Sequence, residues 1–171
     1  MKHAVILFDE KDAHVAQRLE KSLALMQKKG TLRAYSSLHI LPGMDVQATM
    51  AHETARSEVT IIVLSIDLNQ DLIFSMIDKH AANQTDLLVV YANYVEDALL
   101  EEFLKHNVPI TPIMPIASHQ NPDEAYKKIT QAVRSYITKQ LPAASAKTKQ
   151  SAKTKKQLLV LLAARRNMQT D

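Results

Sequence analysis

The sequence contains no cysteine and no tryptophan, and it has only two glycines among its 171 residues. Without cysteine there is no disulfide, no thiolate metal site and no cysteine nucleophile, which fits a cytoplasmic protein. Two glycines, far apart, exclude the Gly-x-Ser-x-Gly elbow of α/β hydrolases. No apolar run approaches the roughly 18 residues of a membrane span. Residues 1–8 run directly into an apolar strand, so we expect no signal peptide.

Positive charge is concentrated at the C-terminal end. Residues 142–171 hold seven Lys or Arg and one Asp, a net charge of +6, whereas residues 1–141 hold fourteen basic and seventeen acidic residues, a net charge of −3. Composition therefore gives no case for nucleic-acid binding by residues 1–141.

A near-repeat, SAKTKQ followed by SAKTKK, occupies residues 145–156. It is polar, basic and low in complexity, and it predicts a linker over residues 142–156, between a domain at 1–141 and a helical segment at 157–171. As an alternative, the lysines of residues 147–156 bind nucleic acid or an anionic membrane, since such contacts need only charge. The aliphatic residues 158–162 cannot all lie on one face of a lone helix, so this segment either docks or begins a further element.

Short apolar runs alternate with amphipathic segments along residues 4–140. The run VTIIVLS at 59–65 lacks polar alternates, which is typical of a strand buried on both faces. Further strands are expected at residues 4–8, 32–35, 87–91 and 110–116. This alternation predicts a parallel sheet with helices on both faces, with function at the carboxyl ends of the strands. Prolines at 109, 112 and 115 place the last strand at a sheet edge.

Two aspartates stand where helices are expected to begin. Asp12 is placed to cap the helix that stops near Gly30, and Asp45 to cap a helix that runs to about residue 57. Helical spacing predicts that Val46 and Met50 face inward on the second helix.

The connection between the second strand and that second helix, residues 36–43, is long for an α/β unit, and long loops in compact domains are often functional. Leu38, Ile40 and Leu41 are apolar, and exposed apolar residues on a loop are typical of a partner surface. The alternative is that they fold back on the sheet.

Taken in order, four stretches resemble those of Toll/interleukin-1 receptor (TIR) domains of the bacterial type. Residues 6–12 (ILFDEKD) are similar to the opening strand and loop, typically I-S-Y-S-x-K-D. Residues 35–43 (YSSLHILPG) are similar to the second strand and its BB loop, typically W-D-D-x-x-I-x-P-G. Residues 57–67 (SEVTIIVLSID) resemble A-D-I-I-I-L-L-V-S-P-D, and residues 121–126 (NPDEAY) resemble the start of the last helix.

The resemblance covers residues 3–140 and implies a flavodoxin-like α/β fold, with a five-stranded parallel sheet of order 2-1-3-4-5 and helices on both faces. Members of this family either associate with other TIR domains in immune signalling, often through the BB loop, or cleave the bond between nicotinamide and ribose in NAD. For association, the resemblance implies a partner that is a second copy or another TIR domain, and an interface at Leu38, His39, Ile40, Leu41, Pro42 and Gly43.

The catalytic members carry a glutamate on the helix after the central strand, where a carboxylate engages the ribose and stabilises positive charge on the sugar. Met76 stands at that position here, and methionine carries no charge. Asp78 lies about 200° further round the helix, so it replaces the acid only if the helix placement is shifted. If NAD binds, the resemblance implies contacts from Phe8, Asp9 and Tyr35.

The sequence favours an assembly domain of an immune or stress-response protein, with no cofactor expected. No metal is expected either, because the seven histidines form no i, i+4 pair and no Glu-bracketed motif. The alternative is an NAD glycohydrolase, with NAD as its substrate. A third interpretation is a receiver-like domain with Asp9 as phosphoacceptor, although receivers carry that residue on the third strand, where Ser65 stands.

Overall fold

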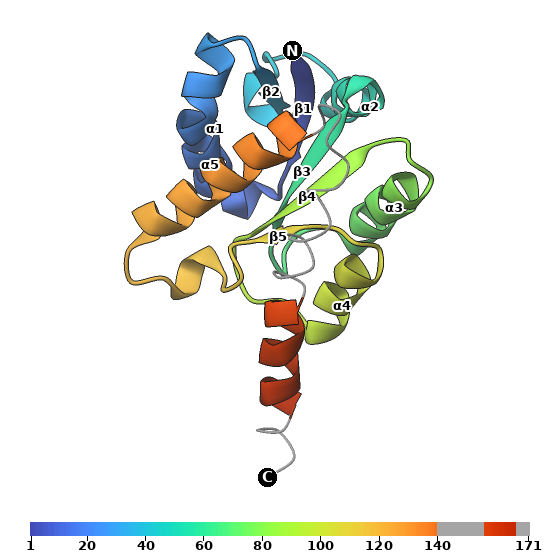
Figure 1. Cartoon of the computed structure of the whole chain (residues 1–171). Helices are drawn as coiled ribbons and strands as arrows, with labels where there is room; N and C mark the ends of the chain where they lie inside the picture. The colour runs from blue at the N-terminus through green and yellow to red at the C-terminus, as the bar shows by residue number, and fades with distance from the viewer. Residues whose placement is uncertain (140–155, 167–171) are drawn as a thin grey trace.

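The computed structural model describes residues 1–139 and 156–166, which contain a five-stranded, all-parallel sheet (Figure 1). The strand order is β2-β1-β3-β4-β5, which confirms the flavodoxin-like α/β fold and places β3 at the centre. The strands are β1 (Lys2–Leu7), β2 (Leu32–Ser36), β3 (Val59–Leu64), β4 (Asp86–Tyr91) and β5 (Ile110–Thr111). The proline-rich last strand lies at the edge, as predicted, but it is only two residues long.

Helices cover both faces of the sheet (Figure 1). One layer consists of α1 (Ala13–Lys28) and α5 (Pro122–Lys139), and the other of α2 (Val46–Arg56), α3 (Gln70–Ala81) and α4 (Asp97–Lys105). Three short 3-10 helices lie in the connections: η1 (Glu10–Asp12), η2 (Ser37–His39) and η3 (Ile116–Ser118). Across residues 1–139 and 156–166, no helix combines the length and apolar character of a membrane span.

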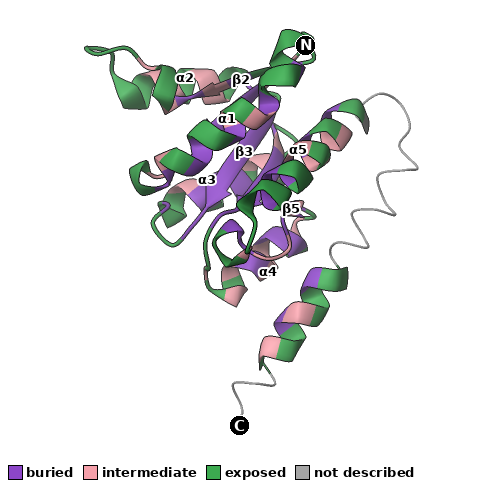
Figure 2. Ribbon diagram, turned by 90° about the vertical axis from the view of Figure 1, so that its left-hand side faces the viewer, coloured by how far each residue is buried: buried purple, intermediate pink, exposed green. Residues whose placement is uncertain are grey.

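The central strand explains why two separate cores form. All six residues of β3 are buried, and successive side chains of a strand point to opposite faces. Ile61 and Val63 therefore pack under α1 and α5, whereas Ile62 and Leu64 pack under α3 and α4. Figure 2 shows this buried sheet between exposed outer helix surfaces.

Gly30 ends α1 with a Schellman motif. The Thr31 N–H donates to the Met26 carbonyl at 3.1 Å, and the Gly30 N–H donates to the Gln27 carbonyl at 3.1 Å. Gly30 has a φ of +71°, a conformation that side chains disfavour, so glycine is required where the chain turns back into β2.

Two local predictions need correction. Asp12 is the N-cap residue of α1, but its side chain makes no capping hydrogen bond and accepts the Ser65 hydroxyl instead. Val46 does not face inward, because it is 53% exposed. The half-buried residues of α2, including Met50 and Glu53, begin one turn later, so only the later turns of this helix contact the sheet.

Residues 156–166 form a further helix, the C-terminal helix, which lies against the α4 side of the domain (Figure 1). Leu158 and Leu162 are 3% and 2% exposed and join the core beneath α3 and α4, whereas Leu159 and Val160 face solvent. Of the two alternatives for this segment, docking is the one observed. Most of the predicted linker, residues 142–155, and residues 167–171 lie outside the described part of the chain.

Candidate functional site

The loop between β2 and α2 presents apolar side chains to solvent. Leu38 is 38% exposed, Leu41 67%, Met44 48% and Val46 53%. Only Ile40 is half-buried among the apolar residues of this stretch. Leu38 and Leu41 therefore do not fold back on the sheet. We call Leu38, Leu41, Met44 and Val46 the apolar loop surface.

Glu20 on α1 fixes the start of this loop. The Ser36 hydroxyl donates to Glu20 Oε1 at 2.6 Å, and His39 Nε2 lies 3.1 Å from the same oxygen. The Ser36 oxygen also accepts the Leu38 N–H at 3.2 Å, and the Tyr35 and His39 rings are 5.6 Å apart. One carboxylate thus holds residues on both sides of Leu38. A loop that is already ordered loses less entropy when a partner binds.

The far end of the loop is ordered by backbone chemistry. Pro42 and Gly43 are exposed at the turn, and Gly43 has a φ of +91°, which glycine adopts without strain. The Met44 N–H donates to the Leu41 carbonyl at 3.2 Å. The Asp45 carboxylate then accepts the N–H of the third residue after it at 3.0 Å, which confirms the predicted cap of α2.

The residues predicted to contact NAD lie at the carboxyl ends of β1 and β2. Phe8 is half-buried and packs against the core on the α1 and α5 face. Asp9 caps η1 by accepting the Lys11 N–H at 3.0 Å. Tyr35 is half-buried on β2, opposite Val5 of β1. The structure therefore places these three residues on neighbouring elements, with Asp9 engaged in a structural hydrogen bond.

Asp78, the acid predicted for NAD cleavage, does not lie with Phe8, Asp9 and Tyr35. Met76, predicted from the resemblance to stand where TIR enzymes carry a glutamate, is 3% exposed and belongs to the core between α3 and the sheet. Asp78 is exposed near the C-terminal end of α3, about 12 Å along the helix axis from its first residue. Because α3 begins beside the carboxyl end of β3, Asp78 lies toward the amino ends of the strands.

A polar cluster connects the loops after β1 and β3. Asp12 and Ser65 are 7% and 2% exposed, and the Ser65 hydroxyl donates to the Asp12 carboxylate. The Ser65 oxygen accepts the Asp67 N–H at 3.3 Å, and Lys11 Nζ donates to Asp67 Oδ1 at 3.1 Å. That hydrogen bond, together with the charges of Asp67, Asp9 and Asp12, raises the pKa of the Lys11 ammonium group. The Ser65 side chain thus joins the loop after β1 to the loop after β3.

The interpretation of the site rests on its own chemistry and on the motif resemblance. Within the described residues, no group of three or more His, Asp or Glu side chains is placed to hold a metal ion. Comparison with protein-family models, with curated proteins and with solved structures found no match to this chain. Sequence reasoning missed Glu20, because nothing in the helical pattern of α1 signals its partners sixteen and nineteen residues later.

Proposed function

We propose that this protein is a TIR-like assembly domain, which associates with a second copy of itself or with another TIR domain through the apolar loop surface. One observation carries the proposal: Leu38, Leu41 and Met44 of the loop and Val46 at the start of α2 are exposed, and hydrogen bonds hold the loop in place at both ends. Large apolar side chains exposed on an ordered loop are typical of interaction sites. The absence of cysteine and the motif resemblance support a role in cytoplasmic immune or stress signalling.

The arrangement of acidic residues favours assembly over NAD cleavage. A glycosidic bond is broken with help from a carboxylate close to the sugar. Buried Met76 supplies no charge, and exposed Asp78 lies near the wrong end of α3 to meet Phe8 and Tyr35. The NAD glycohydrolase alternative therefore rests on the motif resemblance alone.

The contribution of Leu41 to such an interface can be estimated. Full burial of a Leu side chain contributes about 1.5–3 kcal/mol. Leu41 is 67% exposed, so covering it contributes about 1–2 kcal/mol. A symmetric dimer buries the residue twice. Replacing Leu41 by Asp should therefore weaken dimerisation by at least about 2–4 kcal/mol, or roughly 30- to 700-fold.

Sedimentation velocity from low-micromolar to near-millimolar concentration tests this proposal. We expect the wild-type mass to rise with concentration and the Leu41→Asp variant to stay monomeric. Val160→Asp is the matched control, because Val160 is 62% exposed but lies on the C-terminal helix, away from the loop. A wild-type chain that stays monomeric throughout would contradict self-association, and two variants that associate equally would contradict the apolar loop surface as its interface.

Nicotinamide release from NAD, measured at high protein concentration, separates the two candidate activities. We expect no release above that of a heat-treated sample, also when the protein is clustered by an affinity tag. Release that Asp78→Asn abolishes would establish the hydrolase instead.

A further inference from the structure

The outer face of the C-terminal helix, residues 156–166, is apolar and exposed. Leu159 on this helix is 46% exposed and Val160 is 62% exposed. Residues 158–164 contain no polar side chain, so the helix is apolar on all sides over about two turns. A helix of this kind is normally covered all round, by protein or by lipid. Here the core beneath α3 and α4 covers only its inner side.

The exposed face begins with a basic residue. Lys156, Val160 and Ala163 are exposed and lie on one side of the helix, because residues three and four positions apart are neighbours on a helix surface. A lysine in this place can extend its ammonium group into a polar layer while its methylene groups contact apolar ones. Figure 2 shows the helix at the periphery of the domain, where a broad surface can approach it.

Positive charge is concentrated just before this helix. Residues 147–156 hold five lysines, and residues 142–170 hold no acidic residue. Both arginines of the helix form ion pairs with acidic residues of α4. Because residues 1–141 carry a net charge of −3, attraction to an anionic surface has to come from the lysine-rich residues.

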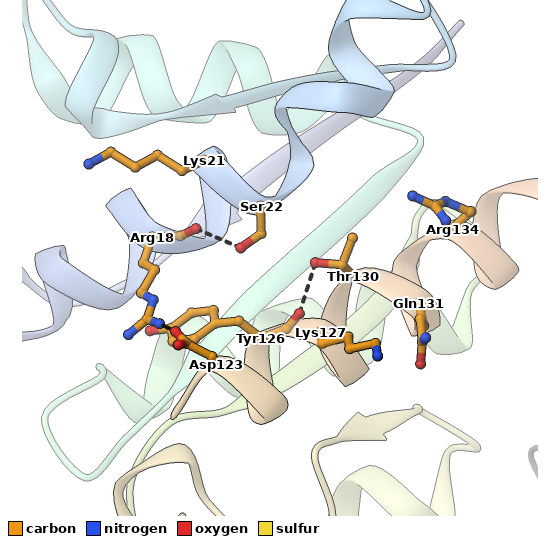
Figure 3. A pocket seen from close by; sticks show the side chains of 9 residues that line it. All are labelled: Arg18, Lys21, Ser22, Asp123, Tyr126, Lys127, Thr130, Gln131 and Arg134. Carbon is orange, nitrogen blue, oxygen red and sulfur yellow. Dashed lines mark hydrogen bonds and ion pairs between the residues drawn. The ribbon is translucent and has the colours of Figure 1, made fainter. Parts of the chain in front are cut away.

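The basic residues of α1 and α5 do not form a comparable surface. Figure 3 shows that Lys21 on α1 points away from Lys127 and Arg134 on α5. Arg18, the remaining basic residue in this view, pairs with Asp123. The C-terminal segment is therefore the place where positive charge and exposed apolar side chains occur together.

These two properties select the partner of the C-terminal segment. A second copy carries the same charge of +6 on residues 142–171, so two such segments repel each other. Nucleic acid would pair with the lysines but leave the apolar face uncovered, and residues 142–171 contain no aromatic side chain to stack on a base. An anionic bilayer offers both a negatively charged surface and an apolar layer beneath its headgroups.

We propose that the C-terminal helix, together with residues 147–156 before it, binds the surface of an anionic membrane. The helix lies among the headgroups with Leu159 and Val160 toward the acyl chains, while Leu158 and Leu162 keep it attached to the domain. Its eleven residues are too few to span a bilayer, which takes about 20, so the contact is peripheral. This activity is independent of the apolar loop surface.

Co-sedimentation of the full chain with vesicles tests the proposal. The test vesicles contain phosphatidylcholine and phosphatidylserine in equal parts, and the comparison vesicles contain phosphatidylcholine alone. We expect strong binding to the anionic vesicles and little to the neutral ones. Added salt should weaken the binding, because it screens the attraction between the lysines and the headgroups.

The variant Leu159→Gln/Val160→Gln tests the apolar face. Covering the exposed parts of these two side chains strengthens partitioning roughly 15- to 200-fold, so the variant should lose about that factor. Leu25→Gln/Ile66→Gln is the matched control, because it makes the same kind of change at side chains that are 53% and 77% exposed, on α1 and in the loop after β3. The control should bind the vesicles as the wild type does.

The variant Lys153→Gln/Lys155→Gln tests the charge. Each basic residue near an anionic surface strengthens binding about fivefold, so this variant should bind roughly 25-fold more weakly. Lys28→Gln/Lys105→Gln is the control, since it removes the same charge from two exposed lysines elsewhere and should have a much smaller effect. The lysine variant leaves the helix unchanged, so it remains informative if the apolar variant fails to fold.

Three results would overturn the proposal. The first is no binding of the wild type to the anionic vesicles, including the case in which a labelled oligodeoxythymidylate binds through the lysines instead. The second is a loss in either variant that its control matches. The third is a loss in the lysine variant with none in the apolar variant, because the contact would then be electrostatic only.

Discussion

The docking of the C-terminal helix, residues 156–166, gives a prediction whose size follows from the structure. Leu158 and Leu162 are 3% and 2% exposed, one helical turn apart, and pack into the core beneath α4. Arg165 adds a hydrogen bond to Asp97 at 3.2 Å and places its guanidinium carbon 5.5 Å from the centre of the Tyr94 ring. These contacts must offset the cost of forming a short, separate helix.

The free-energy cost of forming this helix and the free energy gained from its contacts nearly cancel. Initiating an isolated helix costs about 4 kcal/mol, because the nucleation constant is about 10⁻³. Burying two leucines contributes about 3–6 kcal/mol, and the Arg165 contacts add about 1 kcal/mol. The helix is therefore held by only about 0–3 kcal/mol. A Leu→Ala change in a core costs about 2–5 kcal/mol, so Leu158→Ala should release the helix without unfolding the domain.

Hydrogen exchange read by mass spectrometry tests this expectation. In Leu158→Ala, the amides of residues 156–166 should exchange at close to the rate of an unprotected peptide, while those of β3 keep their protection. Leu159→Ala is the matched control, because it makes the same chemical change on a residue that is 46% exposed. Equal exchange in the two variants would refute the docking argument, as would a loss of protection in β3.

Three further substitutions test single contacts. Glu20→Ala removes the carboxylate that holds the loop through His39, so amides of residues 37–40 should exchange faster, and self-association should weaken. Asp45→Ala removes the cap of α2 and should lower the free energy of unfolding by about 1 kcal/mol in urea denaturation. A hydrogen bond from Lys2, at 2.7 Å, lowers the pKa of Glu58 below its ordinary value of 4.5, so this group adds stability above about pH 4.5 that is lost as the pH falls through the folded-state pKa. Glu58→Gln should remove that pH dependence, which amounts to a few tenths of a kcal/mol because the pair is exposed to solvent.

Each of these three predictions has a result that would contradict it. For the loop, unchanged exchange at residues 37–40 would mean that Glu20 does not hold it. For the cap, Gln47→Ala is the control, since Gln47 is exposed in the same helical turn and should cost much less than Asp45→Ala. For the ion pair, a wild type and a Glu58→Gln variant with parallel stability curves between about pH 3 and pH 6 would show that the pair contributes nothing.

The sheet was predictable because its signals are local. Apolar runs without polar alternates identified β3 and β4, and three prolines identified the edge position of β5. The N-cap at Asp45 was likewise predictable from the sequence, because Asp45 and the residue whose N–H it accepts are only three residues apart. The inward direction predicted for Val46 was wrong, because helical periodicity identifies a face but not where along the helix that face meets the sheet.

Features that join distant residues were not predictable in the same way. Ser65 and Asp12 are 53 residues apart, and the side chain of Asp12 serves this contact rather than the cap that its position suggested. Arg18 of α1 and Asp123 of α5 form an ion pair although they are far apart in the sequence, because α1 and α5 pack on the same face of the sheet.

The core contacts of helix α1 determine what its two flanks can reach. Its buried positions, centred on Leu19, pack onto the sheet and fix the rotation of the helix. At about 100° per residue, Glu20 then lies on one flank and Arg18 on the other. The first flank reaches His39 in the loop, and the second reaches Asp123 on α5. The same core contacts therefore orient both the loop contact of Glu20 and the ion pair that Arg18 forms with α5.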